Sequence, residues 1–173
     1  VESALKGERV SQEVDFRTQP YERGLAIHSQ LSPVELPDGR VIGGVAILQD
    51  ITATRNDQDV QQALYQIANL AHRAEVAAAL YAGIHQIVRK ILPAENFYIA
   101  LWNKTTQRLS FPYWVDQYDP NPGVVPLAKG LTEYVLHSGQ TLLAENDLCK
   151  EMENRDEIDR LGTPGVAWLG WAV

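Results

Sequence analysis

The sequence contains a single cysteine, Cys149, in 173 residues. One thiol cannot form an internal disulfide or supply a cysteine-rich metal site, and it suits a reducing compartment. We therefore expect a cytoplasmic protein. The four histidines, at positions 28, 72, 85 and 137, do not show the His-Glu-x-x-His spacing of a zinc pair. We expect neither a metal nor another cofactor.

Basic residues are also scarce. Fifteen Lys and Arg stand against 22 Asp and Glu, which gives a net charge of -7. The basic residues are scattered, whereas phosphate binding needs them clustered, so we expect no nucleic-acid partner. The longest purely apolar run, Val41–Leu48, is far shorter than the ~20 residues that a membrane helix needs. The G-x-S-x-G signature of serine hydrolases is missing, and we do not expect an enzyme.

The first 55 residues are predicted to form an antiparallel meander. Its three strands are expected at Val10–Phe16, Leu25–Leu31 and Arg40–Gln49. We expect Val1–Leu5 to end a helix capped by Gly7. Pro33 should break the chain after the second strand, and Pro37-Asp38-Gly39 should turn it into the third. The long aliphatic third strand favours a central position, yet three strands alone should not make a stable domain.

From Asp57 the period of the apolar residues becomes helical. Val60, Leu64, Ile67 and Ala71 are spaced as in the seam of a short coiled coil, and Ala63 and Leu70 widen the stripe. The stripe of the expected helix, Asp57–Ala71, has two interpretations. It either pairs with a second copy of the chain or packs on the sheet of its own domain.

The remaining sequence alternates helical and strand patterns, so the predicted fold class is α+β. A helix over Glu75–Leu92 should be stopped by Pro93. The other expected elements are a central strand at Phe97–Trp102, a turn at Asn103–Gln107, a strand at Arg108–Val115, a surface loop at Asp116–Pro126, a helix at Leu131–His137, a strand at Thr141–Ala144, a surface helix or loop at Asn146–Gly162, and a strand at Val166–Val173.

The first segment resembles the C-terminal half of a PAS domain. The residues that carry this resemblance are Pro33, Asp38-Gly39, Gly43 and Asp50-Ile51-Thr52. In that family the Asp-Ile-Thr motif marks the point where the sensor sheet continues into a signalling helix. The resemblance implies a PAS part over residues 1–55 that lacks the helices of the family's ligand cavity.

Residues 56–173 resemble a linker helix followed by a GAF domain of bacterial sensory proteins. The matching pieces are Ala94–Leu101, Phe111–Asp116, Lys129–Leu136, Gly139, Leu142-Leu143 and Trp168–Gly170. The family continues past this tryptophan with further strands and a helix. The resemblance therefore implies a GAF-type antiparallel sheet flanked by helices and truncated at its C-terminus.

Three chemistries known in GAF domains fit this sequence poorly. Bilin attachment uses a histidine directly after the cysteine, but Lys150 follows Cys149. Methionine sulfoxide reduction needs paired cysteines. The cyclic-nucleotide signature begins superficially at Asn103-Lys104 and is not completed. We expect Cys149 to be an incidental thiol in a polar loop.

Aromatic residues indicate where a small molecule could bind. Apolar walls with a few hydroxyl or indole groups are typical of ligand sites, and such residues fall on elements that would line a GAF cavity. The candidates are Tyr98, Trp114 and Tyr134.

A module order of PAS and then GAF resembles sensory proteins whose output is a histidine kinase or a cyclic-di-GMP enzyme, in the same polypeptide. We expect a homodimer that relays a conformational signal through its linker helix. The predicted relay residues are Asp50, Thr52, Val60, Leu64 and Ile67. Asp50 is expected to pair with Arg55, Arg23 or Arg40, and Thr52 or Thr54 could cap the helix. The alternative function is a GAF receptor whose small-molecule pocket is the functional centre.

Overall fold

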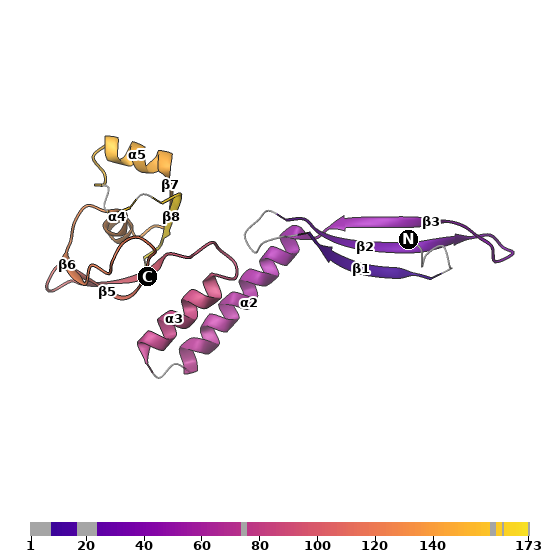
Figure 1. Cartoon of the computed structure of the whole chain (residues 1–173), viewed down its shortest axis with the longest axis horizontal. Helices are drawn as coiled ribbons and strands as arrows, with labels where there is room; N and C mark the ends of the chain where they lie inside the picture. Colours follow the sequence, from indigo (N-terminus) through magenta and orange to yellow (C-terminus); the bar gives the residue numbers. More distant parts are fainter. Residues whose placement is uncertain (1–7, 17–23, 74–75, 160–161, 164, 173) are drawn as a thin grey trace. The chain divides into compact units, whose positions relative to one another are not determined.

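The structure is a computed structural model that describes residues 8–16, 24–73, 76–159, 162–163 and 165–172. It has the predicted α+β fold class and divides into two compact units, residues 1–94 and 95–173 (Figure 1). The predicted helix end at Val1–Leu5 and its Gly7 cap lie outside the described residues. None of the helices within the described ranges is long and apolar enough to cross a membrane.

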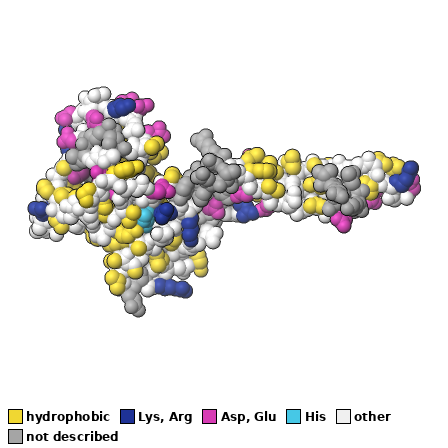
Figure 2. All heavy atoms as spheres, in the orientation of Figure 1, with side chains coloured by type: hydrophobic (Ala, Val, Ile, Leu, Met, Phe, Trp, Pro, Cys, Tyr) yellow, Lys and Arg dark blue, Asp and Glu magenta, His cyan; other side chains and the backbone are white. Residues whose placement is uncertain are grey.

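The first unit contains the predicted antiparallel meander. Its strands are β1 (Val10–Asp15), β2 (Ala26–Glu35) and β3 (Val41–Asp50), and they lie in the order β1-β2-β3. The prediction that the third strand is central is therefore wrong, because β2 holds that place. The aliphatic run on β3 does not signal burial on both faces. Ile47 is 60% exposed and Leu48 66%, and hydrophobic side chains are visible along the sheet in Figure 2.

Pro33 does not break the second strand, contrary to prediction. It pairs with Gly44, and β2 continues to Glu35. The pairing of β2 with β1 ends at Leu31, so Pro33 lies where that side of β2 is an edge, a position that tolerates proline. The predicted turn into β3 is confirmed, since Gly39 has a positive φ of 83° and its amide donates to the Leu36 carbonyl.

Two helices complete the first unit. Helix α2 spans Thr52–Arg73, so it begins directly after the sheet and not at Asp57 as predicted. Helix α3 spans Ala77–Val88, so it ends before the predicted Leu92. Turns follow it, in which the Lys90 amide donates to the Ile87 carbonyl. The predicted first residue of this helix, Glu75, lies outside the described residues.

Helices α2 and α3 pack against each other (Figure 1). A Cβ atom placed on Gly83 of α3 would lie 2.2 Å from a methyl carbon of Leu70, so the missing side chain leaves room for this leucine. Ala63 of α2 and Ile87 of α3 are buried. Part of the apolar stripe of α2 therefore packs on a neighbouring helix, an arrangement that neither interpretation of the stripe included.

The second unit contains two sheets. In the first, β4 (Phe97–Asn103), β5 (Arg108–Val115) and β6 (Val124–Pro126) lie in the order β4-β5-β6. The strand beginning at Phe97 is thus an edge strand, not the central one predicted, and β6 forms within the predicted loop. The second sheet pairs β7 (Leu142–Glu145) antiparallel with β8 (Ala167–Gly170).

Helix α4 (Leu131–Ser138) begins as predicted and ends one residue after the predicted His137, before Gly139 with its φ of 64°. The region predicted as a surface helix or loop forms helix α5 (Asn146–Asn154). Cys149 is buried on this helix, so the prediction of a thiol in a polar loop is wrong. Cys149 and Met152 are three residues apart and face the core together. The buried apolar residues of the unit include Leu109, Val135, Ala144, Cys149, Met152 and Ile158.

Candidate functional site

The passage from β3 into α2 is fixed by a small network around Asp50, Ile51 and Thr52, here called the sheet–helix junction. The Asp50 carboxylate accepts hydrogen bonds from the Thr52 amide at 2.9 Å and from the Thr52 hydroxyl at 2.6 Å. The Ile51 carbonyl accepts the first bond of the helix, from the Arg55 amide at 2.9 Å. Asp50 therefore satisfies an amide that the first turn of α2 would leave unpaired.

The same network continues the β-ladder into the helix. The β2–β3 pairing has Ile27 opposite Asp50, so Ile51 falls opposite Ala26, and its amide donates to the Ala26 carbonyl at 2.8 Å. The return bond of an antiparallel pair would run from the Ala26 amide to the Ile51 carbonyl. That carbonyl has turned into the helix. The Thr52 hydroxyl takes its place and accepts from the Ala26 amide at 3.0 Å.

The hydrogen bonds from Thr52 lower the pKa of Asp50, and the bond from its hydroxyl has the larger effect. Since folding lowers this pKa, the ionised carboxylate stabilises the junction above its ordinary pKa of 3.8. This contribution is lost as the pH falls through the lowered value.

The ion pairs at the junction differ from the prediction. Arg55 of α2 pairs with Glu13 of β1, and Arg40 pairs with Asp38 at 2.8 Å, so neither arginine partners Asp50 as predicted. The third predicted partner, Arg23, lies outside the described residues. The first turn of α2 is therefore tied to β1 by charge, to β2 by the Thr52 hydroxyl and to β3 by the chain itself.

The predicted seam residues of α2 lie further along the helix. Val60 is 46% exposed and Leu64 is 62% exposed, while Ile67 is half-buried. Leu70 packs on Gly83 of α3, and Ala63, two turns earlier on the same side of α2, is buried, whereas Val60 and Leu64 of the seam stay exposed.

In the second unit, Tyr98 and Trp114 lie together and Tyr134 lies elsewhere. The Tyr98 and Trp114 rings stack with centroids 5.1 Å apart, and Phe111 meets both rings edge-on. The Tyr98 hydroxyl accepts from the Trp168 indole at 3.0 Å and shares a 2.7 Å hydrogen bond with the Thr132 hydroxyl. Tyr98 thus links β4 to β8 and α4 through one oxygen.

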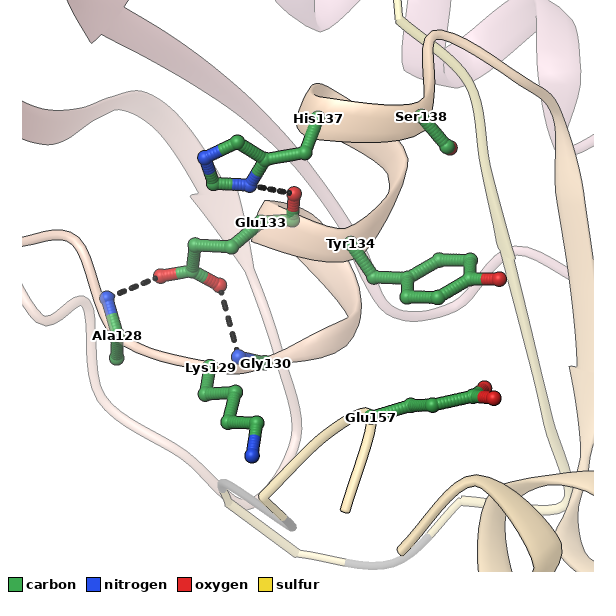
Figure 3. A pocket seen from close by; sticks show the side chains of 8 residues that line it. All are labelled: Ala128, Lys129, Gly130, Glu133, Tyr134, His137, Ser138 and Glu157. Atoms are coloured by element: carbon green, nitrogen blue, oxygen red, sulfur yellow. Dashed lines mark hydrogen bonds between the residues drawn. The ribbon is translucent and has the colours of Figure 1, made fainter. Parts of the chain in front are cut away.

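A pocket of about 430 Å³ lies beside α4 (Figure 3). It is lined by Ala128, Lys129, Gly130, Glu133, Tyr134, His137, Ser138 and Glu157. Of the three predicted ligand residues, only Tyr134 is among them. Glu133 is buried at 5% exposure, and its carboxylate accepts from the amides of Ala128 at 3.0 Å and Gly130 at 3.2 Å.

Several residues of these sites were not predicted. Ala26 and Glu13 contribute to the junction through long-range pairing, which the local sequence pattern does not reveal. Glu133 could have been found, because a Glu three residues after a helix-starting position is a known capping signal. Glu157 lies after the end of α5, and no sequence pattern marks it as a residue that lines the pocket.

In the part of the chain that the structure describes, no three His, Cys, Asp or Glu side chains gather to hold a metal ion. Comparisons with protein-family models, with curated proteins and with solved structures found no match. The resemblance to PAS and GAF domains therefore stays a prediction.

Replacing Thr52 with valine should weaken the junction, because the buried Ala26 amide loses its acceptor while the side-chain shape is kept. We expect the first unit to lose about 1–3 kcal/mol, measured by amide hydrogen exchange in β2 and α2. Thr54→Val is the matched control, since Thr54 is exposed on the same helix. Equal protection in the two variants would contradict the role given to the Thr52 hydroxyl.

Replacing Tyr98 with phenylalanine should destabilise the second unit by about 1–3 kcal/mol, because the Trp168 N–H loses its partner. Tryptophan fluorescence during urea unfolding measures this unit, since Trp102, Trp114, Trp168 and Trp171 all belong to it. Tyr118→Phe is the control, at 71% exposure.

The Tyr98 effect should also depend on pH. Burial raises the pKa of Tyr98, so its hydroxyl stabilises the fold below its ordinary pKa of 10.0. The stabilisation is lost as the pH rises through the raised value. A Tyr98→Phe protein as stable at neutral pH as the Tyr118→Phe control would show that the link from Tyr98 to Trp168 and Thr132 is dispensable.

Proposed function

We propose that the chain is a sensory or regulatory module of a bacterial signal-transduction protein, with a PAS-type meander, a linker helix and a GAF-type unit. It would work in the cytoplasm as a homodimer and pass a conformational signal through α2 to a kinase or cyclase output domain of the same polypeptide. No catalytic role and no nucleic-acid partner are proposed for it.

The sheet–helix junction is the observation that carries this proposal. The backbone of β2, the backbone of β3 and a side chain of β1 all hold the first turn of α2, through Thr52, Ile51 and Arg55. A shift of any strand in this sheet must therefore change bonds at the start of the helix. The Arg55–Glu13 ion pair is exposed, and exposed pairs contribute little individually, which suits an equilibrium that a signal can bias.

The open side of α2 supports a homodimer. Leu70 packs on Gly83 of α3 and Ala63 is buried, whereas Val60 and Leu64 keep about half of their surface exposed, at 46% and 62%. Exposed apolar residues at seam spacing are typical of helices that pair, and the α2–α3 hairpin would supply the help that two heptads need.

The pocket beside α4 favours a second candidate function, that of a small-molecule receptor. Its volume of about 430 Å³ lies in the range of known ligand sites. Tyr134, one of the predicted ligand residues, lines it. In this version the second unit binds the effector and α2 only spaces the two units.

The dimer seam can be tested by replacing Val60 and Leu64 together with asparagine. Loss of two apolar side chains that pairing of the helices would bury should weaken self-association about tenfold or more, measured by analytical ultracentrifugation. Tyr65→Asn is the control. It is 70% exposed and points to another side of α2, since successive helical residues are about 100° apart. Unchanged association of the double variant would remove the dimer from the proposal.

The relay itself can be tested by measuring whether a substitution at the junction changes the association of the seam. If the first turn of α2 transmits strain, Thr52→Val should change the dimer dissociation constant by about threefold or more, although Thr52 lies outside the seam. Thr54→Val should leave the constant unchanged. Hydrogen exchange would first establish that Thr52→Val weakens the junction. If both variants then have the same dimer dissociation constant, the relay is overturned and the small-molecule receptor is the remaining candidate function.

A further inference from the structure

We propose that His85 of α3 is the residue that transmits a change in α2 and α3 to the second unit. This inference rests on the relay proposed above and extends it beyond α2. Helix α2 ends at Arg73, and α3, which packs on it, is the last helix before the second unit begins at Glu95. Along the chain, the end of α3 therefore lies between α2 and the second unit.

His85 holds the point at which the chain leaves the first unit. Its side chain is buried, with 2% of the residue exposed. Its Nε2 lies 2.6 Å from the carbonyl oxygen of Ala94, nine residues further along the chain. A carbonyl can only accept, so Nε2 carries the proton and donates this bond. Ala94 is the last residue of the first unit, and the imidazole ties it back to α3.

The contact between α2 and α3 lies next to His85. Leu70 of α2 occupies the space beside Gly83, where an added Cβ would lie 2.2 Å from a methyl carbon of the leucine. Gly83 comes two residues before His85, and the buried Ile87 comes two residues after it. Closely packed side chains leave α3 little freedom to stay in place when α2 shifts. A movement of α2 therefore displaces the backbone that carries the imidazole.

The turns between α3 and Ala94 are held by hydrogen bonds as well. The amides of Arg89, Ile91 and Leu92 donate to carbonyls of the last turn of α3, at 2.9, 3.0 and 2.9 Å. Ala94 is thus attached to α3 both by these turns and by the bond that its own carbonyl accepts. When α3 moves, Ala94 moves with it.

The second unit holds the chain again two residues later. The Asn96 side-chain oxygen accepts from the Gln117 amide at 3.1 Å, and both residues belong to the second unit. One residue, Glu95, separates Asn96 from Ala94. A single residue spans at most about 3.6 Å, so a displacement of Ala94 is not absorbed before Asn96. It reaches the Gln117 amide and the start of β4.

Amide hydrogen exchange of the whole chain tests this, with Thr52→Val as the change applied to α2. In the unchanged protein, Thr52→Val should speed exchange of the Gln117 amide and of β4 about threefold or more. The same effect should persist with His85→Gln, which keeps a side-chain N–H donor. It should vanish with His85→Leu, which keeps a similar volume and removes the donor. A side chain that only fills space would not distinguish glutamine from leucine.

Two further variants complete the experiment. His72→Leu removes an exposed imidazole near the end of α2, and it should leave the effect of Thr52→Val on Gln117 intact. His85→Met replaces His85→Leu if the branched side chain unfolds α3, since an unbranched thioether adapts to the same space.

The outcomes separate this inference from the relay. If Thr52→Val changes the dimer dissociation constant but not the exchange of Gln117 and β4, the relay stands and the role of His85 is overturned. That comparison needs no substitution at His85. If His85→Leu or His85→Met transmits the effect as fully as His85→Gln, the bond to Ala94 is not needed and the inference is overturned. If Thr52→Val changes neither quantity, the relay and the inference fail together.

Discussion

The first unit depends on a single hydroxyl that stands in for a backbone carbonyl. At the end of β3 the chain must leave the ladder and begin a helix, and the Ile51 carbonyl cannot serve both structures. It accepts from the Arg55 amide, which leaves the amide of the buried Ala26 without its ladder partner. A buried unpaired amide is costly, and the Thr52 hydroxyl removes that cost. The sharp passage from strand to helix is possible because a hydroxyl follows the last ladder residue.

This arrangement makes the helix start part of the sheet. Thr52 donates to Asp50 and accepts from Ala26, so one oxygen joins β3, β2 and α2. Further along, α2 is held by α3 on one side, and its Val60 and Leu64 stay uncovered. In the relay proposed above, a change in the sheet would alter the bonds at the start of α2.

The elements of this fold could be predicted where local patterns specify them. The meander, the turn at Gly39 and the end of α4 follow from period-two patterns and glycine chemistry. The apolar period predicts the start of α2 too late, because its first residues are polar; only the capping chemistry of Thr52 and Thr54 indicates an earlier start. The edge position of β3 could not be predicted, because its aliphatic run is typical of a buried strand although Leu48 is exposed. Long-range partners such as Glu13 and Arg55 have no local signal at all.

The two helix starts described above share a physical solution that limits what this protein can bind. At α2 the Asp50 carboxylate takes the Thr52 amide, and at α4 the Glu133 carboxylate takes those of Ala128 and Gly130. Each carboxylate occupies amides that would otherwise attract an anionic ligand. In a chain with a net charge of -7, internal carboxylates satisfy these amides without any ligand. The amides of Ala128 and Gly130, at the start of α4, are therefore not free to bind a ligand in the pocket beside it.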